Sequence, residues 1–236
     1  MPSNIKLRRG NAKELIIDVP DNSQDLILTD PPYDMITANI RTPPLSDFAK
    51  EILVKNFRRI LKPNGNVIVY VGLRDKFRWY GKFKQYNFAL RSELIMVYPA
   101  GMKSPNHFLP ANESAIHYTI SKHYYFEKGA IFAEVYKTQR ARGSTRTWGY
   151  DYGTAPAEKM HVTPKPLGMV QKLVEILCPV GGNVLDPFMG SGTTGEACVI
   201  TGRNFTGFEM IKDIYLYAKD RIKTAGGKRK ENEEWW

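Results

Sequence analysis

Cysteine is scarce in this sequence: the 236 residues include only Cys178 and Cys198. Two cysteines are too few for a disulfide framework and they lack the spacing of metal ligands, so no disulfide scaffold and no metal site are predicted. Long apolar runs are also missing, and none approaches the length that crosses a bilayer. Residues 1–6 lack the apolar core of a signal peptide. These absences predict a soluble protein of the cytoplasm, associated with the nucleoid.

Acidic residues are outnumbered, with 24 Asp and Glu against 34 Lys and Arg, which gives a formal net charge of +10 at pH 7. A basic excess of this size favours a polyanionic partner, and it favours nucleic acid over a membrane surface. Charge alone is equally compatible with simple solubility. The nature of the partner therefore has to be argued from motifs.

Short apolar runs alternate with segments of helical periodicity along the chain. Strands are predicted at 25–29, 67–71, 90–97, 114–120, 183–186 and 204–209, and helices at 46–60, 76–85, 167–177, 192–200 and 214–224. Residues 62–65 are predicted to form a turn. Strands that alternate with helices indicate an α/β fold with a mainly parallel sheet that is covered on both faces.

The length suits one substantial domain with a small insertion, so a single domain over residues 1–236 is predicted. Periodicity weakens after residue 128, where Gly, Thr, Arg and aromatic residues accumulate. We therefore predict a target-recognition insertion at about 128–158. The charged end of the chain, about 226–236, is predicted to be mobile.

The tetrapeptide Asp30–Tyr33 directly follows a predicted strand. Proline cannot continue a central ladder, so the strand ends there and Asp30 lies at its carboxyl end, where sheets of this kind bind ligands. The Asp30 carboxylate and the Pro31 carbonyl can accept the two N–H groups of an exocyclic amine, and Pro31 and Pro32 fix the direction of that carbonyl. Tyr33 can stack on a base that has left the duplex. The alternative is an ordinary turn that begins with Asp before proline.

A second motif, Asp186–Thr194, lies between a predicted strand and a predicted helix. Its glycines, Gly190 and Gly192, allow a tight turn and a close approach of the backbone to a ligand. The spacing is not the dinucleotide fingerprint and no lysine occupies the phosphate-loop position, which argues against nicotinamide and ATP. Glu209 ends the next strand, at a distance typical of an acid that binds both ribose hydroxyls. The alternative for Glu209 is a solvated acid at a strand end.

The order of these motifs, Asp30–Tyr33 first, then His161–Pro166, then Asp186–Thr194, resembles the β-group amino methyltransferases of DNA, the DNA methylase N-4/N-6 family. The similarity runs from Gly10 to Arg221, and Asn112-Glu113 resembles a further recurring segment of the family. The resemblance implies a Rossmann-like S-adenosylmethionine-dependent methyltransferase fold. It also implies a mainly parallel seven-stranded sheet with one reversed strand and a circularly permuted motif order.

S-adenosylmethionine is the cofactor that the resemblance implies. Phe188, Gly190 and Gly192 would lie against its methionine part, Glu209 would hold its ribose, and Asp30 would lie beside its sulfonium and the target amine. The full set of implied cofactor-binding residues is Asn11, Asp30, Thr163, Lys165, Pro166, Asp186, Pro187, Phe188, Gly190, Ser191, Gly192, Thr193 and Glu209. Two positions depart from the family pattern: Asn11 replaces an acid near the cofactor adenine, and Pro164 replaces a glutamine.

The resemblance implies methylation of an amino group in double-stranded DNA, with Asp30, Pro31, Pro32 and Tyr33 as the catalytic residues. Adenine N6 is favoured, because cytosine-N4 members more often carry Ser at the position of Asp30. Cytosine N4, an RNA base and an inactive DNA-binding relative are the alternatives, and the enzyme would be solitary or paired with a restriction enzyme. A homodimer is a further expectation. The residues predicted to contact bases or phosphates are Arg41, Arg140, Arg142, Arg146 and Trp148.

Overall fold

The computed structural model describes residues 3–32, 45–73, 75–97, 112–128 and 164–233. Its centre is one seven-stranded sheet with the order β1-β7-β6-β2-β3-β5-β4. Strand β5 runs antiparallel to both of its neighbours, while the other pairs are parallel. The predicted α/β fold with one reversed strand is confirmed. The strands are β1 (Ile5–Arg9), β2 (Gln24–Thr29), β3 (Leu61–Val71), β4 (Ala89–Val97), β5 (Asn112–Thr119), β6 (Asn183–Asp186) and β7 (Asn204–Glu209).

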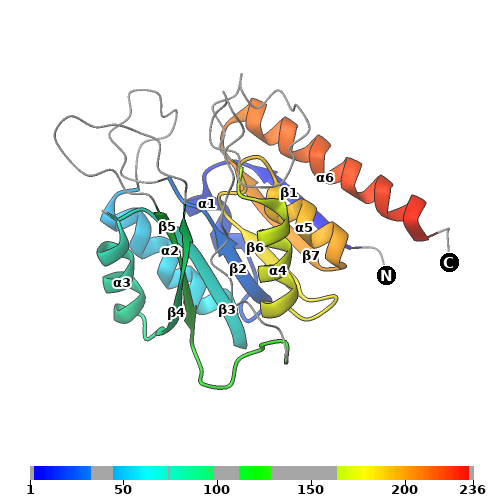
Figure 1. Ribbon diagram of the computed structural model, residues 1–236. Coiled ribbons are helices and arrows are strands. Elements are labelled where there is room, and N and C mark those ends of the chain that lie inside the picture. The colour runs from blue at the N-terminus through cyan, green and yellow to red at the C-terminus, as the bar shows by residue number, and fades with distance from the viewer. Residues whose placement is uncertain (1–2, 33–44, 74, 98–111, 129–163, 234–236) are drawn as a thin grey trace.

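Helices cover both faces of the sheet (Figure 1). Successive side chains of a strand point to opposite faces, so Leu26 and Leu28 of β2 pack in the core under α4, α5 and α6, whereas Ile27 packs in the core under α1, α2 and α3. A strand buried on both sides reads as a continuous apolar run, which is why β2 was predictable. The helices are α1 (Ala12–Leu15), η1 (a 3₁₀ helix, Ile16–Asp18), α2 (Asp47–Ile60), α3 (Lys76–Gln85), α4 (Leu167–Leu177), α5 (Thr193–Thr201) and α6 (Lys212–Glu233).

The structure differs from the predictions at strand β1, at the start of strand β3 and at the end of helix α6. Strand β1 was not predicted, because it is a short edge strand whose apolar and basic residues alternate. Strand β3 starts at Leu61, not at 67, and contains the predicted turn as an irregularity: Gln24 pairs with Leu61, but Leu26 pairs with Asn66. Helix α6 continues to Glu233, nine residues past its predicted end, because the Lys, Arg and Glu residues there favour a helix.

Three predicted site acids lie at one edge of the sheet. Asp30 follows β2, Asp186 ends β6 and Glu209 ends β7. These three strands are parallel neighbours in the order β7-β6-β2, so their carboxyl ends point the same way. The chain passes from β2 to β3 on one side and from β6 to β7 on the other, so the strand order switches between β2 and β6. Sheets of this kind bind ligands at such a switch point.

Candidate active site at the carboxyl edge of the sheet

Strand β2 stops at Asp30 because two prolines follow. Proline has no N–H for the ladder, so the chain leaves the sheet at this point. Pro31 is buried and Pro32 is half-buried, while the Asp30 side chain keeps 31% of its surface exposed. The backbone next to Asp30 is therefore held by the packing of the two prolines, while its carboxylate remains accessible at the edge of the sheet.

The loop between β6 and α5 is a tight turn built on glycine. Gly190 and Gly192 have positive φ values of 49° and 83°, a region that favours glycine. The Gly192 N–H donates to the Met189 carbonyl at 2.8 Å and closes the turn. A Cβ on Gly190 would meet nothing closer than 3.9 Å, so its backbone borders open space. This arrangement gives a ligand close access to the backbone.

The Asp186 side chain fixes this loop by two hydrogen bonds. One carboxylate oxygen accepts the Phe188 backbone N–H at 3.1 Å, and the other accepts the Thr194 hydroxyl at 2.7 Å. The side chain is buried, and burial raises the pKa of the carboxyl to about 7, an effect that these hydrogen bonds oppose and the nearby Asp30 reinforces. Asp186 is thus a structural acid of the loop that changes charge near neutral pH.

Glu209 lies directly beside the glycine loop. Its Oε1 accepts the Ile211 N–H at 2.7 Å, and the Gly10 N–H donates to its main-chain carbonyl at 3.0 Å. Burial raises the pKa of the Glu209 carboxyl, while the backbone N–H groups of Ile211, Met210 and Gly190 pull it down. A half-buried carboxylate next to an open glycine backbone suits a ligand that carries hydroxyl donors.

Lys165, which precedes α4, contacts Asp30. Its Nζ donates to Asp30 Oδ2 at 2.5 Å and lies 3.4 Å from Glu113 Oε2 on β5. Nζ also lies 4.9 Å from the centre of the Tyr70 ring on β3. Burial disfavours the charged lysine, but Asp30 and Glu113 outweigh it and raise the pKa of Lys165. Four segments that are far apart in the chain therefore meet at the Asp30 carboxylate.

Sequence reasoning assigned no role to three of the residues at this edge. Glu113 was noted only as part of a recurring segment, and Tyr70 only as part of an apolar strand. Arg221 of α6 was noted only as the end of the family match, yet its Nη1 donates to the Thr193 hydroxyl at 2.9 Å and to the Ser191 hydroxyl at 3.2 Å. Its Nε pairs with Glu196 at 2.5 Å. Arg221 thus connects the glycine loop to α6, a contact that no local pattern reveals.

The remaining predicted residues divide into described and undescribed positions. The Asn11 side chain accepts the Lys13 N–H at 3.1 Å and caps α1. Pro187 is buried in the glycine loop, and Pro166 is buried at the start of α4. Tyr33, Arg41, Arg140, Arg142, Arg146, Trp148 and Thr163 lie outside the described residues, as does the insertion predicted at 128–158 apart from Lys128.

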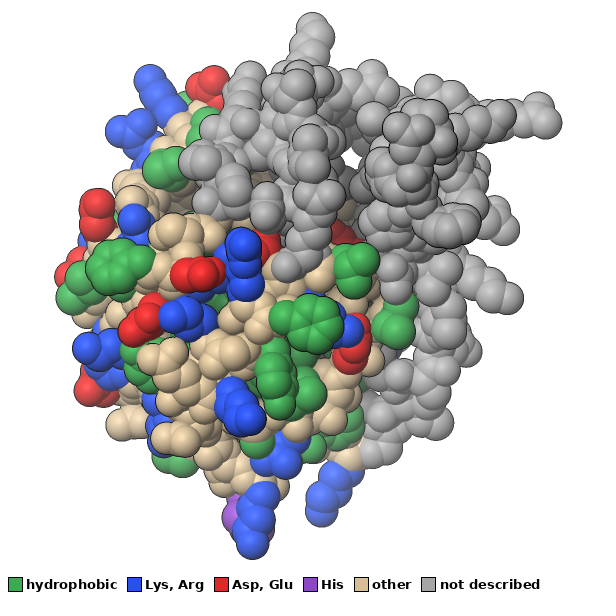
Figure 2. Space-filling model, turned by 90° about the vertical axis from the view of Figure 1, so that its left-hand side faces the viewer, with side chains coloured by type: hydrophobic (Ala, Val, Ile, Leu, Met, Phe, Trp, Pro, Cys, Tyr) green, Lys and Arg blue, Asp and Glu red, His purple; other side chains and the backbone are tan. Residues whose placement is uncertain are grey.

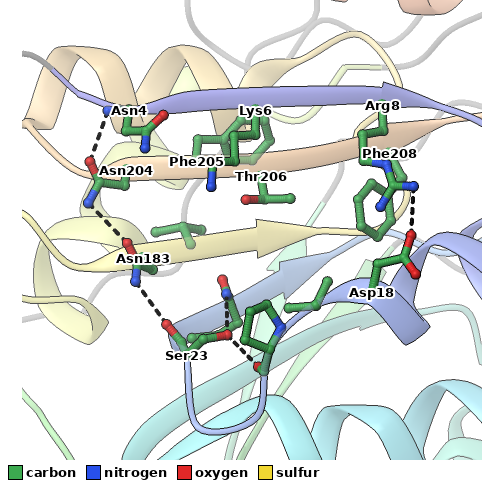
Figure 3. A pocket seen from close by; sticks show the side chains of 14 residues that line it. Asn4, Lys6, Arg8, Asp18, Ser23, Asn183, Asn204, Phe205, Thr206 and Phe208 are labelled. Atoms are coloured by element: carbon green, nitrogen blue, oxygen red, sulfur yellow. Dashed lines mark hydrogen bonds and ion pairs between the residues drawn. The ribbon is translucent and has the colours of Figure 1, made fainter.

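An open pocket of about 440 Å³ lies elsewhere, along the face of β1, β7 and β6 that carries Lys6 and Arg8 (Figure 3). A row of hydrogen bonds crosses it: the Asn4 N–H donates to Asn204 Oδ1 (2.9 Å), Asn204 Nδ2 donates to Asn183 Oδ1 (3.0 Å), and Asn183 Nδ2 donates to the Ser23 carbonyl (2.9 Å). None of the predicted site residues lines this pocket. The asparagines tie neighbouring strands together at the end of the sheet away from Asp30.

The side of the molecule that carries α3 shows apolar side chains among lysines and arginines (Figure 2). Leu73, Phe77 and Tyr80 are the large apolar residues exposed on α3 and the turn before it. Basic residues on this side are interspersed and do not form one continuous stripe. In the described part of the chain, no helix is long and apolar enough to span a membrane. The same residues contain no group of three or more His, Cys, Asp or Glu that could hold a metal ion.

Comparison with known proteins decides the family. The family model described as DNA methylase matches residues 24–220. The chain belongs to this family. It is a DNA methyltransferase of the N4/N6 family, and the resemblance predicted from the two motifs is confirmed. The match includes Asp30, Lys165 and the glycine loop.

Two curated relatives of the DNA methylase family are similar over most of the chain. One is the type II methyltransferase M.BglII of Bacillus subtilis, 24% identical, with 98% of this chain and 71% of that protein covered. The other is the type II methyltransferase M.HpaI of Haemophilus parainfluenzae, also 24% identical, with 90% and 72% covered.

Solved structures share the fold. The M1.HpyAVI–SAM complex has a TM-score of 0.68 at 23% identity, with 92% of this chain and 99% of that chain covered. The cytosine-N4-specific PvuII DNA methyltransferase has a TM-score of 0.73 at 18% identity, with 94% and 87% covered. TTHA0409 of Thermus thermophilus, complexed with S-adenosyl-L-methionine, has a TM-score of 0.66 at 20% identity, with 94% and 96% covered.

Proposed function

We propose that this DNA methyltransferase transfers the methyl group of S-adenosylmethionine to the exocyclic N6 of adenine in double-stranded DNA. The observation that carries the proposal is the placement of Asp30, at the end of β2, beside the glycine loop that follows β6. Family membership supplies the reaction class, and Asp at the first position of Asp30–Tyr33 favours adenine over cytosine.

The residues present suit S-adenosylmethionine. The open backbone at Gly190 would lie against the methionine part and the Glu209 carboxylate would accept the ribose hydroxyls. Phe188 lies in this loop, and Asp30 lies at the same edge of the sheet. When bound, the cofactor supplies an activated methyl group whose carbon–sulfur bond breaks as the carbon–nitrogen bond forms. The enzyme's contribution is mainly to position the amine.

Asp30 and Pro31 would prepare the amine for attack. The adenine amino lone pair is delocalised into the ring, so the nitrogen is a poor nucleophile. The Asp30 carboxylate accepts one N–H and the Pro31 carbonyl accepts the other, which directs the lone pair out of the ring plane. Asp30 then takes up the proton that the nitrogen loses after transfer. We assign Tyr33 the stacking contact with a base rotated out of the duplex.

Cytosine N4 is the second candidate, because one structure of the same fold is a cytosine-N4-specific enzyme with a TM-score of 0.73. The Asp30 carboxylate and the Pro31 carbonyl could also accept the two N–H groups of a cytosine amine. An inactive DNA-binding relative is a third candidate that the intact Asp30 and glycine loop argue against.

Duplex DNA is the proposed partner, and the net charge of +10 supports it. The recognition insertion at about 128–158, the single domain, the homodimer and a location in the cytoplasm with the nucleoid remain predictions. So do the DNA contacts of Arg41, Arg140, Arg142, Arg146 and Trp148.

The test is to incubate the protein with labelled S-adenosylmethionine and unmethylated DNA of mixed sequence, and to identify the labelled nucleoside by mass spectrometry. N6-methyladenine from the native protein, and none from Asp30→Ala, is the expected result. N4-methylcytosine would keep the mechanism and overturn the base. Cofactor binding without any labelled base would overturn DNA methylation by this chain.

A further inference from the structure

Lys165 and Glu113 are nearly buried charges at the catalytic edge, with exposed side-chain fractions of 11% and 14%. Lys165 Nζ contacts Asp30 Oδ2 at 2.5 Å and Glu113 Oε2 at 3.4 Å. One cation therefore lies between two carboxylates. A buried ion pair gives little net stability, because removing charges from water offsets their attraction. The cluster thus calls for an explanation other than stability.

We propose that Lys165 and Glu113 are positioning residues for Asp30: Lys165 fixes the direction of the carboxylate and keeps it ionised, and Glu113 holds Lys165 in place. This inference rests on the proposed role of Asp30 as the acceptor of the target amine. A neutral carboxylic acid would donate a hydrogen bond from one oxygen, so only the ionised form accepts reliably from the amine. Lys165 supplies the charge that preserves this form.

Glu113 also sets the charge of the cluster. Among the described residues, these two carboxylates and one ammonium carry a net charge of −1, which complements the positive charge that the reacting amine acquires as it is methylated. Without Lys165, Asp30 and Glu113 would face each other as two like charges, and one of them would take up a proton. With Lys165 between them, both stay ionised.

Tyr70 limits where Lys165 can lie. The Tyr70 side chain is 2% exposed, and its ring lies 4.9 Å from Lys165 Nζ, which suits a cation–π contact. Burial, followed by the carboxylates of Asp30, Glu113 and Asp186, raises the pKa of the Tyr70 hydroxyl well above its ordinary value, so the ring stays neutral. Lys165 is thus confined between a ring and two carboxylates.

The described groups that face Asp30 come from four elements. Lys165 precedes α4, Glu113 lies on β5, Tyr70 lies on β3 and Asp186 lies at the end of β6. Tyr70 is neutral, and Asp186 is hydrogen-bonded to Thr194 and the loop backbone and acts on Asp30 through its charge alone. A change at Lys165 or Glu113 therefore alters the charge beside Asp30 while the other two groups remain.

The experiment measures kcat and KM for S-adenosylmethionine between pH 5 and 9 on a methylatable DNA. In Lys165→Met we expect the acid limb of the kcat profile to move up by about one to three pH units, because Asp30 loses its neighbouring cation. At neutral pH kcat should fall by a factor on the order of 100, with a smaller change in KM. In Lys165→Arg the limb should stay in place.

In Glu113→Gln we expect the acid limb of the kcat profile to shift in the opposite direction. This substitution removes a like charge from the vicinity of Asp30 and keeps the shape of the side chain, so the acid limb should move to lower pH. Lys172→Met is the matched control: Lys172 lies on α4, is 58% exposed and pairs with Glu175, so its profile should equal that of the native protein. Opposite shifts from two substitutions at one cluster are not expected from a structural role.

An unmoved acid limb in a folded Lys165→Met, or shifts of the same sign in both variants, would overturn the inference. If Lys165→Met does not fold, as judged by thermal unfolding, Lys165→Arg and Glu113→Gln decide the question. The failure of the proposed function is recognisable separately, since the native protein would then methylate no base. A native enzyme active on either base leaves the inference fully testable.

Discussion

Asp186 makes the unfolding free energy depend on pH in a way that can be calculated. Burial raises its native pKa to about 7 from an ordinary value of 3.8. Below pH 3.8 the carboxyl is protonated in both states. As the pH rises, the unfolded chain loses the proton first, so the native state loses relative stability until the pH passes about 7. The stabilising contribution of the protonated group is therefore present in acid and lost on the way to neutrality.

The size of this effect follows from the gap between the two pKa values. Each pH unit corresponds to 1.36 kcal/mol, so a gap of about three units amounts to roughly 4 kcal/mol. The steepest change lies between pH 4 and pH 7. The hydrogen bonds from Thr194 and the Phe188 N–H lower this pKa, and their effect is already contained in the value of about 7.

The assay is guanidinium unfolding of the native protein and of Asp186→Asn from pH 4 to pH 8, followed by tryptophan fluorescence, to which the buried Trp79 contributes. Asparagine has nearly the same shape and cannot ionise, so the difference between the two proteins isolates residue 186. The native protein should lose roughly 4 kcal/mol relative to the variant across this range. Asp220→Asn, at an exposed site on α6, should show no comparable change. A pH-independent difference, or one that grows in favour of the native protein with pH, would refute the reasoning.

Two further predictions concern the packing of a glycine and a buried ion pair. Gly192→Ala should lower the unfolding free energy by about 1–3 kcal/mol more than Gly190→Ala, since a Cβ at Gly192 would lie 3.0 Å from that of Ala218, whereas one at Gly190 meets open space. Denaturant titration checks this, and equal losses would contradict it. Lys50→Met should cost about 3–5 kcal/mol because it removes the buried cation that pairs with Asp75 Oδ1 at 2.9 Å, whereas Arg78 approaches the same oxygen only to 3.9 Å and is 54% exposed. Lys50→Met combined with Asp75→Leu should restore most of that loss, and a double variant as unstable as the single one would contradict the charge argument.

Local pattern was sufficient to predict most of the fold. Strands β2 and β6 each have a short apolar centre, with an acid directly after β2 and at the end of β6, and the proline pair after Asp30 marks where β2 leaves the sheet. The short edge strand β1 was not predicted because most of its residues are exposed to water. The residues after Leu61 read as a turn, yet they remain in β3 as an irregularity, since register depends on the partner strand as well as on local sequence.

The candidate site was predictable only where one segment supplies the chemistry. Asp30 and the glycine loop each have a local signature, whereas the cluster around Lys165 does not. Residues 30, 113 and 165 come together only through the sheet order, in which β5 lies next to β3 and β3 lies next to β2. Lys165 was assigned to the cofactor because the resemblance to the family implies that role. Its contact with Asp30 is a tertiary contact that cannot be predicted from the spacing of the motifs.

The order of strands in the sheet also bears on how the protein is made. Strands β6 and β7 leave the ribosome after β1 and β2, yet they lie between these two strands in the sheet. Ile5 pairs with Phe205, two hundred residues later. A nascent chain that stops before residue 183 therefore has a gap in the middle of its sheet and no glycine loop. Closing that gap requires contacts between residues about 200 positions apart, a slow step in folding. Synthesis of the segment after residue 183 thus determines when Asp30 first lies beside the glycine loop.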